Sequence, residues 1–232
     1  MTQLILDLKP EQIPSLDNFV AGANAELVGR LRAIAVPGGF DMIYVWGPPG
    51  SGRSHLLAAV AQESAPRRPT ALLAGAAVGT DLTLPPGGLV IIDDVETLSA
   101  DAQQALFRTF NSARLVGLSL LLSGPVPPLH LELREDLRTR IGQALIYEVK
   151  ALDDDEKSAA LRRHAMLRGM RVEDGLVQYL LRHGRRDLPS LMAVLDGLDR
   201  ASLQQKRPAT LPLLREVMQL QLETDNDEAG SV

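Results

Sequence analysis

A glycine-rich segment, residues 47–54, restricts the fold of this chain more than any other feature of the sequence. It follows an apolar run, residues 42–46, that has the length of a buried strand, and it leads into a helix expected over residues 53–63. The order of its residues, G-x-x-x-x-G-R-S, is the pattern of a phosphate-binding loop with Arg53 in the usual place of lysine. Such a loop joins a strand to a helix, so we expect an α/β fold.

The chemistry of this loop favours nucleotide binding. Its glycines let consecutive backbone N–H groups converge on one anion at a helix N-terminus. Ser54 can ligate Mg²⁺, and Arg53 can pair with phosphate oxygens, although its wide fork replaces a compact ammonium. We therefore expect nucleotide binding with weakened hydrolysis. The alternative is an ordinary glycine and proline turn between a strand and a helix.

Four more apolar runs have the length of strands buried on both faces. They are residues 70–74, 89–93, 118–123 and 144–149. Helices are expected over residues 25–36, with Asn24 as the N-cap, and over residues 100–116, so strands and helices alternate as in parallel βαβ units. Beyond residue 152 the pattern is helical only, over residues 155–168, 173–182, 187–205 and 211–222.

The run at residues 89–92 ends in two carboxylates, Asp93 and Asp94, about forty residues after the phosphate loop. Asp93 would hold Mg²⁺, directly or through water, and Asp94 could orient an attacking water molecule. A strand that ends in aspartate is common by itself. Together with a phosphate loop it is the expected second half of a nucleotide site.

Charge and composition narrow the class of protein further. The net charge is −5, but residues 1–156 hold 12 Lys+Arg and 19 Asp+Glu, whereas residues 157–222 hold 12 and 6, which indicates two parts with different electrostatic roles. The chain has no cysteine, which excludes disulfides and thiolate metal sites and fits a cytoplasmic location. No apolar run reaches the roughly 18 residues of a membrane helix, and no signal peptide is expected.

On these motifs the chain resembles the AAA+ ATPases of the DnaA group, and more closely the Hda family of DnaA inactivators. The matching segments are the entry motif (residues 16–20 with Gly22), the phosphate loop (42–55), the Walker B run (91–96), the sensor I strand (120–124) and the arginine-finger segment (133–142). Arginine in the lysine place of the loop is itself similar to Hda. The resemblance spans most of residues 14–222.

The resemblance implies a nucleotide site with ADP or ATP and Mg²⁺, ADP being favoured as the resident nucleotide. Its expected contacts are Gly47, Pro48, Pro49, Gly50, Ser51, Gly52, Arg53, Ser54, His55, Asp93, Ser123 as the sensor group, and Arg186, with Mg²⁺ on Ser54 and Asp93. The family's sensor II arginine would fall on Pro189, which has no donor. Arg186 or Arg185 could replace it, or could form an exposed basic helix cap instead.

The same resemblance assigns the catalytic roles to Asp94 and to Arg140, the latter as an arginine finger that acts on the nucleotide of an adjacent subunit. A finger supplied in trans can raise hydrolysis by about 10³–10⁵. The other interpretation of Arg140 is a solvated helix face with intrahelical pairs to Glu135 or Asp136.

The N-terminal residues resemble the short peptides that dock on the DNA polymerase III beta sliding clamp. In an extended segment, Leu4, Leu6 and Leu8 lie on one side and can enter apolar pockets, while the Gln3 amide offers both a donor and an acceptor. The alternative is an ordinary N-terminal edge strand or a frayed end.

The sequence therefore predicts a clamp-binding arm (residues 1–13), an AAA+ three-layer parallel sheet domain (14–152), a small all-α lid (153–222) and a disordered acidic tail (223–232). The expected function is inhibition of replication initiation: the chain binds the DNA-loaded clamp and promotes hydrolysis of DnaA-bound ATP. A free-standing loader-type ATPase and a DNA-binding initiator-like module are the alternatives. The acidic tail stands where an initiator continues into its DNA-binding domain, so sequence-specific DNA binding is not expected, whereas a homo-oligomer stays possible.

Overall fold

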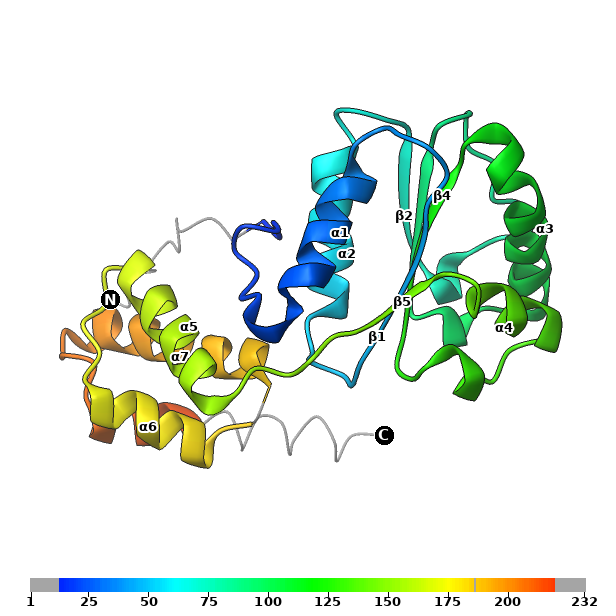
Figure 1. The fold of residues 1–232 in the computed structure, drawn as a ribbon. Helices are drawn as coiled ribbons and strands as arrows, with labels where there is room; N and C mark the ends of the chain where they lie inside the picture. The colour runs from blue at the N-terminus through cyan, green and yellow to red at the C-terminus, as the bar shows by residue number, and fades with distance from the viewer. Residues whose placement is uncertain (1–12, 186, 220–232) are drawn as a thin grey trace, which may run out of the picture. The chain divides into compact units, whose positions relative to one another are not determined.

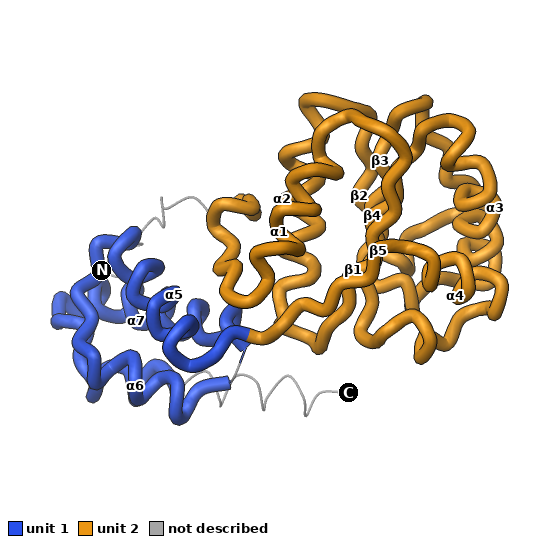
Figure 2. The backbone as a smooth tube through the Cα atoms, viewed as in Figure 1, with its two compact units in different colours: residues 1–10, 152–232 blue, residues 11–151 orange. Residues whose placement is uncertain are grey.

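The computed structural model describes residues 13–185 and 187–219 of the 232-residue chain. The chain divides into two compact units, and the boundary between them lies between Ala151 and Leu152 (Figure 2). Among the described residues, no helix combines the length and the apolar character needed to cross a membrane.

The unit that ends at Ala151 is built on a parallel sheet of five strands in the order β2-β3-β4-β1-β5. The strands are β1 (Met42–Trp46), β2 (Thr70–Ala74), β3 (Leu89–Asp93), β4 (Ser119–Gly124) and β5 (Leu145–Glu148). All four neighbouring pairs are parallel, with Val45 opposite Ser123 and Ile91 opposite Leu121. The α/β fold class is thereby confirmed, and the carboxyl ends of β1, β3 and β4 meet at one edge.

Helices cover both faces of this sheet, as Figure 1 shows. On one face lie α1 (Ala25–Ala35) and α2 (Arg53–Ser64), and on the other lie α3 (Ala100–Val116) and α4 (Glu135–Ile141). Because side chains alternate along a strand, Ile43 and Val45 of β1 join the α1 and α2 core, whereas Tyr44 joins the α3 and α4 core. Short 3-10 turns complete the unit at Gly22–Asn24, Gly75–Ala77, Val95–Thr97 and Pro128–His130.

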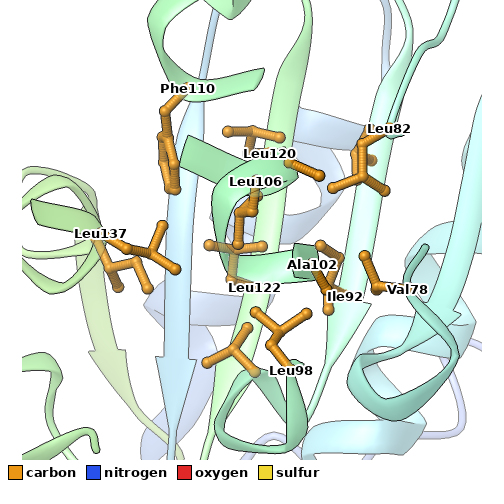
Figure 3. Close-up of a cluster of buried hydrophobic side chains, with 14 of the residues drawn as sticks. Val78, Leu82, Ile92, Leu98, Ala102, Leu106, Phe110, Leu120, Leu122 and Leu137 are labelled. Atoms are coloured by element: carbon orange, nitrogen blue, oxygen red, sulfur yellow. The ribbon is translucent and has the colours of Figure 1, made fainter. Parts of the chain in front are cut away.

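The core under α3 is formed by leucines of β4 and an apolar stripe of the helix. Figure 3 shows Leu106 and Phe110 of α3 beside Leu120 and Leu122 of β4, with Leu137 of α4 in the same cluster. These leucines are fully buried. The layer therefore fixes α3 and α4 firmly against the sheet.

Two details of the sequence prediction were wrong. The strands β2 and β5 lie at the sheet edges, each with one neighbour, so their residues are mostly half-buried or exposed rather than buried on both faces. Asn24 precedes α1 but makes no side-chain cap. Its amide instead donates to the Lys150 carbonyl at 3.0 Å and accepts from the Lys150 N–H at 2.8 Å, because this buried amide finds its partner 126 residues away.

The unit that begins at Leu152 is helical. It contains α5 (Asp154–Leu167), α6 (Asp174–His183) and α7 (Leu188–Gln205), and residues 211–219 are helical as well. Asp153 and Glu156 form a capping box at the start of α5, as expected for an acidic run at a helix N-terminus. The helices share a core that includes Leu161, Leu180 and Leu195, and they confirm the predicted all-α lid.

Candidate functional site

The phosphate loop lies between β1 and α2, with its backbone donors at the start of the helix. A turn at residues 48–51 closes through the Ser51 N–H, which donates to the Pro48 carbonyl at 3.1 Å, and Gly50 supplies the positive φ of 76°. Gly52 precedes α2 with φ of 99° and, lacking a side chain, provides no cap for the first N–H groups of the helix. The start of α2 can therefore offer these groups to an anion.

Residues 15–19 lie against the beginning of α2. A β-carbon at Gly52 would lie 2.9 Å from the Phe19 ring, so no larger residue fits there. The Phe19 and His55 rings are 5.9 Å apart, and His55 Nε2 lies 3.1 Å from the Ser15 carbonyl oxygen. The entry motif and the phosphate loop, separate in the sequence, thus form one contiguous surface.

The end of β3 brings the predicted carboxylates next to Ser123 of β4. The Ser123 hydroxyl donates to the Asp93 carboxylate and accepts from the Asp94 N–H at 3.1 Å. Ser123 is fully buried, so it holds the two aspartates in place from the neighbouring strand. The sequence identified these three residues, and the parallel register of β3 and β4 brings them together.

Asp94 has a strained backbone. Its φ of 55° and ψ of 63° lie in the left-handed region, which costs a residue with a β-carbon about 1–2 kcal/mol. The Asp94 carbonyl accepts from the Thr97 hydroxyl at 2.7 Å and passes so close to Gly75 that a β-carbon there would collide with it. The backbone of Asp94 is thus held in this conformation by its contacts with Thr97 and Gly75.

Arg53 does not extend into solvent at the phosphate loop. Its side chain is 9% exposed, and its Nη2 lies 3.2 Å from Asp94 Oδ1, an ion-pair distance without hydrogen-bond geometry. Its Nη1 is buried and has no hydrogen-bond partner among the described residues. The sequence predicted Arg53 as a phosphate contact, and the structure adds a second partner that no motif indicates.

Sequence reasoning missed Glu96 and Tyr44 as members of this charged group. Burial, together with the charges of Asp94 and Asp93, raises the pKa of Glu96, and Glu96 Oε2 has no hydrogen-bond partner in the described part of the chain. Burial likewise raises the pKa of Asp94, with Asp93 adding to the effect and Arg53 opposing it. Burial also raises the pKa of Tyr44, whose hydroxyl donates to the Val126 carbonyl at 2.7 Å.

These residues fit a phosphate-carrying ligand. The buried polar atoms without a hydrogen-bond partner in the described residues are Ser51 Oγ, Arg53 Nη1, Asp94 Oδ1 and Glu96 Oε2, all from the phosphate loop or the end of β3 and the turn that follows it. Such atoms are rare in folded proteins. Ser51 Oγ and Arg53 Nη1 can donate to phosphate oxygens, whereas the two carboxylate oxygens can be satisfied only by a cation or by a donor such as water. The described residues contain no cluster of three or more acidic or histidine side chains able to hold a metal. Mg²⁺ at nucleotide sites uses one or two protein ligands and the phosphates, which the exposed Ser54 hydroxyl and Asp93 could provide.

Arg140 lies apart from the phosphate loop, on α4, which packs on the opposite face of the sheet from α2 (Figure 1). It is exposed, and Nη1 lies 3.5 Å from Gln143 Oε1, whereas Asp136 pairs with Arg134 at 2.8 Å. The surface around it is hollowed by about 750 Å³, lined by Phe107, Arg134, Glu135, Asp136, Thr139, Arg140 and Gln143. Arg140 is thus presented outward rather than toward this chain's own phosphate loop.

The remaining predicted residues fall in or beside parts of the chain that are not described. Gln3, Leu4, Leu6, Leu8 and Arg186 lie outside the described residues. Pro189 is exposed in the first turn of α7, whose N-cap Asp187 accepts from the Ser190 N–H at 2.9 Å. Arg185 is exposed, with Nε 3.8 Å from Asp187 Oδ2.

Comparison with known proteins matches both units. Residues 154–218 match the family model described as "Hda, lid domain". Domain III of the Thermotoga maritima replication initiation protein DnaA is similar over 91% of this chain and 98% of its own, with 17% identity and a TM-score of 0.78. DnaA bound to AMPPCP and single-stranded DNA is similar over 84% and 69%, with 18% identity and a TM-score of 0.68.

The Thermotoga maritima RuvB Holliday junction branch migration motor is also similar, over 89% of this chain and 72% of its own, with 18% identity and a TM-score of 0.70. These solved structures are similar to the chain at low identity, so they establish its fold alone. The lid gives the finer relationship. The chain therefore has the fold of DnaA domain III, and its residues 154–218 match the model of the Hda lid domain.

Proposed function

We propose that this chain is a nucleotide-binding adaptor that inhibits replication initiation by promoting hydrolysis of DnaA-bound ATP. In this proposal, residues 3–8 dock on the DNA-loaded sliding clamp, the phosphate loop holds a nucleotide, and Arg140 reaches the nucleotide of a DnaA partner. The match of residues 154–218 to the Hda lid carries the proposal, because it distinguishes this chain from other AAA+ proteins of the same fold.

The position of Arg140 supports a role in trans. A finger must be exposed and must project from a rigid element, and Arg140 is exposed on the last turn of α4, which Leu137 and Ile141 anchor in the core. Its guanidinium would stabilise the negative charge that develops on the transferred phosphoryl group. The fork of an arginine can contact two phosphate oxygens together, which a lysine cannot.

The resident nucleotide has a different role in this proposal. The N–H groups at the start of α2 hold its phosphates. The Ser54 hydroxyl and Asp93, which Ser123 orients, would hold Mg²⁺, and the ion would neutralise phosphate charge. Arg53 in place of lysine disfavours turnover at this site. ADP is the nucleotide expected there.

Arg140→Ala tests the finger. We expect it to lower the rate of hydrolysis of DnaA-bound ATP, measured with clamp loaded on DNA, by about 10³-fold, because the phosphoryl charge is left without its stabilising partner. Arg140→Lys should restore little of the rate, since the fork is lost.

Arg134→Ala is the matched control, because Arg134 lines the same hollow but is paired with Asp136. It should retain most of the stimulation. Full stimulation by Arg140→Ala protein with an unchanged unfolding temperature would rule out the finger role.

A free-standing ATPase is the second candidate, favoured by the presence of Asp93 and Asp94 at the end of β3. Turnover of ATP by the purified chain alone distinguishes it from the adaptor. Rates within the ordinary enzymatic range of roughly 1–10³ s⁻¹ without DnaA or clamp would favour this candidate.

A further inference from the structure

We infer that Arg53 is an internal ligand of Asp94, and that this ion pair must open before the Arg53 guanidinium can bind a nucleotide phosphate. Asp94 thereby becomes a residue that sets nucleotide affinity, by competing with phosphate for the same guanidinium. The inference rests on the proposed binding of nucleotide at the phosphate loop.

The first observation is the position of the Arg53 side chain. It belongs to the first residue of α2, yet 9% of it is exposed and Nη2 lies 3.2 Å from Asp94 Oδ1. A buried cation without a carboxylate would be costly, so the pair is the arrangement that this site reaches by itself. The pair leaves the guanidinium poorly satisfied, because Nη1 is buried and has no hydrogen-bond partner in the described residues.

The second observation is that Asp94 is fixed where it meets Arg53. Its N–H donates to Ser123 and its carbonyl accepts from Thr97, and its backbone is held in the left-handed region. The Asp94 backbone therefore stays in place when a ligand draws the guanidinium away, and the carboxylate can follow only as far as rotation of its own side chain allows. The Arg53–Asp94 contact must therefore separate when the guanidinium moves to a ligand.

The third observation is that the contact is not a satisfied hydrogen bond. Asp94 Oδ1 and Arg53 Nη1 both count among the buried atoms without a hydrogen-bond partner in the described part of the chain. A phosphate group offers several anionic oxygens and can satisfy both arms of the fork. The Arg53 guanidinium thus has two states, one bound to Asp94 and one bound to phosphate. Because part of the population stays in the first state, the apparent affinity for nucleotide is lowered.

The arginine is essential to this competition. Its planar fork carries donors on two sides and reaches further than an ammonium, so the same guanidinium can pair with Asp94 in one state and present both arms to a phosphate in the other. An uncharged residue at position 53 would lose the contact with phosphate and would also leave Asp94 without its ion-pair partner.

The test measures the affinity of the full-length chain for fluorescently labelled ADP, in EDTA so that Mg²⁺ does not contribute. Asp94→Asn keeps the shape of the side chain and tolerates the left-handed backbone, but it no longer holds the guanidinium by charge. We expect the Kd to fall on the order of tenfold.

Glu96→Gln is the matched control, because it removes the same charge from the same buried group without breaking the contact with Arg53. Its gain in affinity should be clearly smaller. In a chain that also carries Arg53→Gln, Asp94→Asn and Glu96→Gln should give equal, small gains in affinity for labelled ADP. Each substitution then only removes one negative charge near the phosphate.

Equal gains from Asp94→Asn and Glu96→Gln in the presence of Arg53 would overturn the inference, and leave nucleotide binding intact. No binding of labelled ADP by the parent chain or by any variant would overturn the nucleotide site itself, and the inference with it.

Discussion

At the scale of single residues, the site contains charged groups whose burial lowers the stability of the protein. Arg53, Asp94 and Glu96 are charged side chains with buried atoms, and Asp94 has a strained backbone as well. Buried charges lower stability unless they are fully paired. Their presence next to the phosphate loop indicates selection for binding rather than for stability.

Glu96→Gln should make this cost visible as a dependence of stability on pH. Because the pKa of Glu96 is raised in the folded state, the unfolded state loses its proton first, and stability falls as the pH rises from about 4.3 through the raised pKa. The glutamine amide of the variant stays neutral, so the variant should unfold at a higher temperature at pH 7 and at the same temperature below about pH 4. Thermal unfolding across this range checks it.

The exposed Glu132 offers a control, since Glu132→Gln should leave the unfolding temperature unchanged at every pH. A Glu96→Gln variant that is less stable than the parent at pH 7 would contradict the expectation.

At the scale of elements, one buried side chain connects several segments at the edge of the sheet opposite the site. Arg68 donates to the carbonyls of Ile34, Gly87 and Gly88 and to the Ser119 hydroxyl. It thus links the end of α1 and the beginnings of β3 and β4. The Gly88 carbonyl also accepts from the Ser119 N–H at 2.9 Å, whereas those of Ile34 and Gly87 have Arg68 as their donor.

Arg68→Met should lower the free energy of unfolding by about 3 kcal/mol, because the carbonyls would lose their donors inside the protein. Urea unfolding measures it, and the exposed Arg67→Met is the matched neighbour, with an expected change within about 0.5 kcal/mol. Equal effects of the two substitutions would show that burial of Arg68 contributes nothing.

Local patterns predicted most of these elements. The strand β1 and the helix α3 have the predicted bounds, because apolar periodicity reports burial directly. The roles of Asn24 and Arg53 could not be predicted in this way. Each is decided by a partner far along the chain, Lys150 and Asp94 respectively, and no local pattern contains that information.

At the scale of the whole molecule, the proposed function needs the N-terminal arm and the two compact units in one chain. Residues 1–12 of the arm, which include its docking residues, lie outside the described residues, so its role is argued from the sequence alone. An extended peptide presents alternate side chains on opposite sides. Leu4, Leu6 and Leu8 would therefore enter a partner, while Ile5 would face away.

Gln3→Ala/Leu4→Ala should abolish co-elution of the chain with purified sliding clamp, because it removes an anchor and the adjacent amide. Ile5→Ala should co-elute as the parent does. Co-elution of the double variant at the parent level would refute the docking role of the arm.

The strand order also dictates when the phosphate loop gains its supporting strands during synthesis. β1, which leads into the phosphate loop, is the first strand to be made, but its two neighbours are β4 and β5, the last two. Hydrogen bonding of β1 must therefore wait for contacts over about 75 residues or more, and contacts of such separation form slowly. A ribosome that has released only about the first hundred residues presents the loop sequence on a strand that still lacks both of its neighbours, and β1 can pair with β4 only after Gly124 has left the exit tunnel.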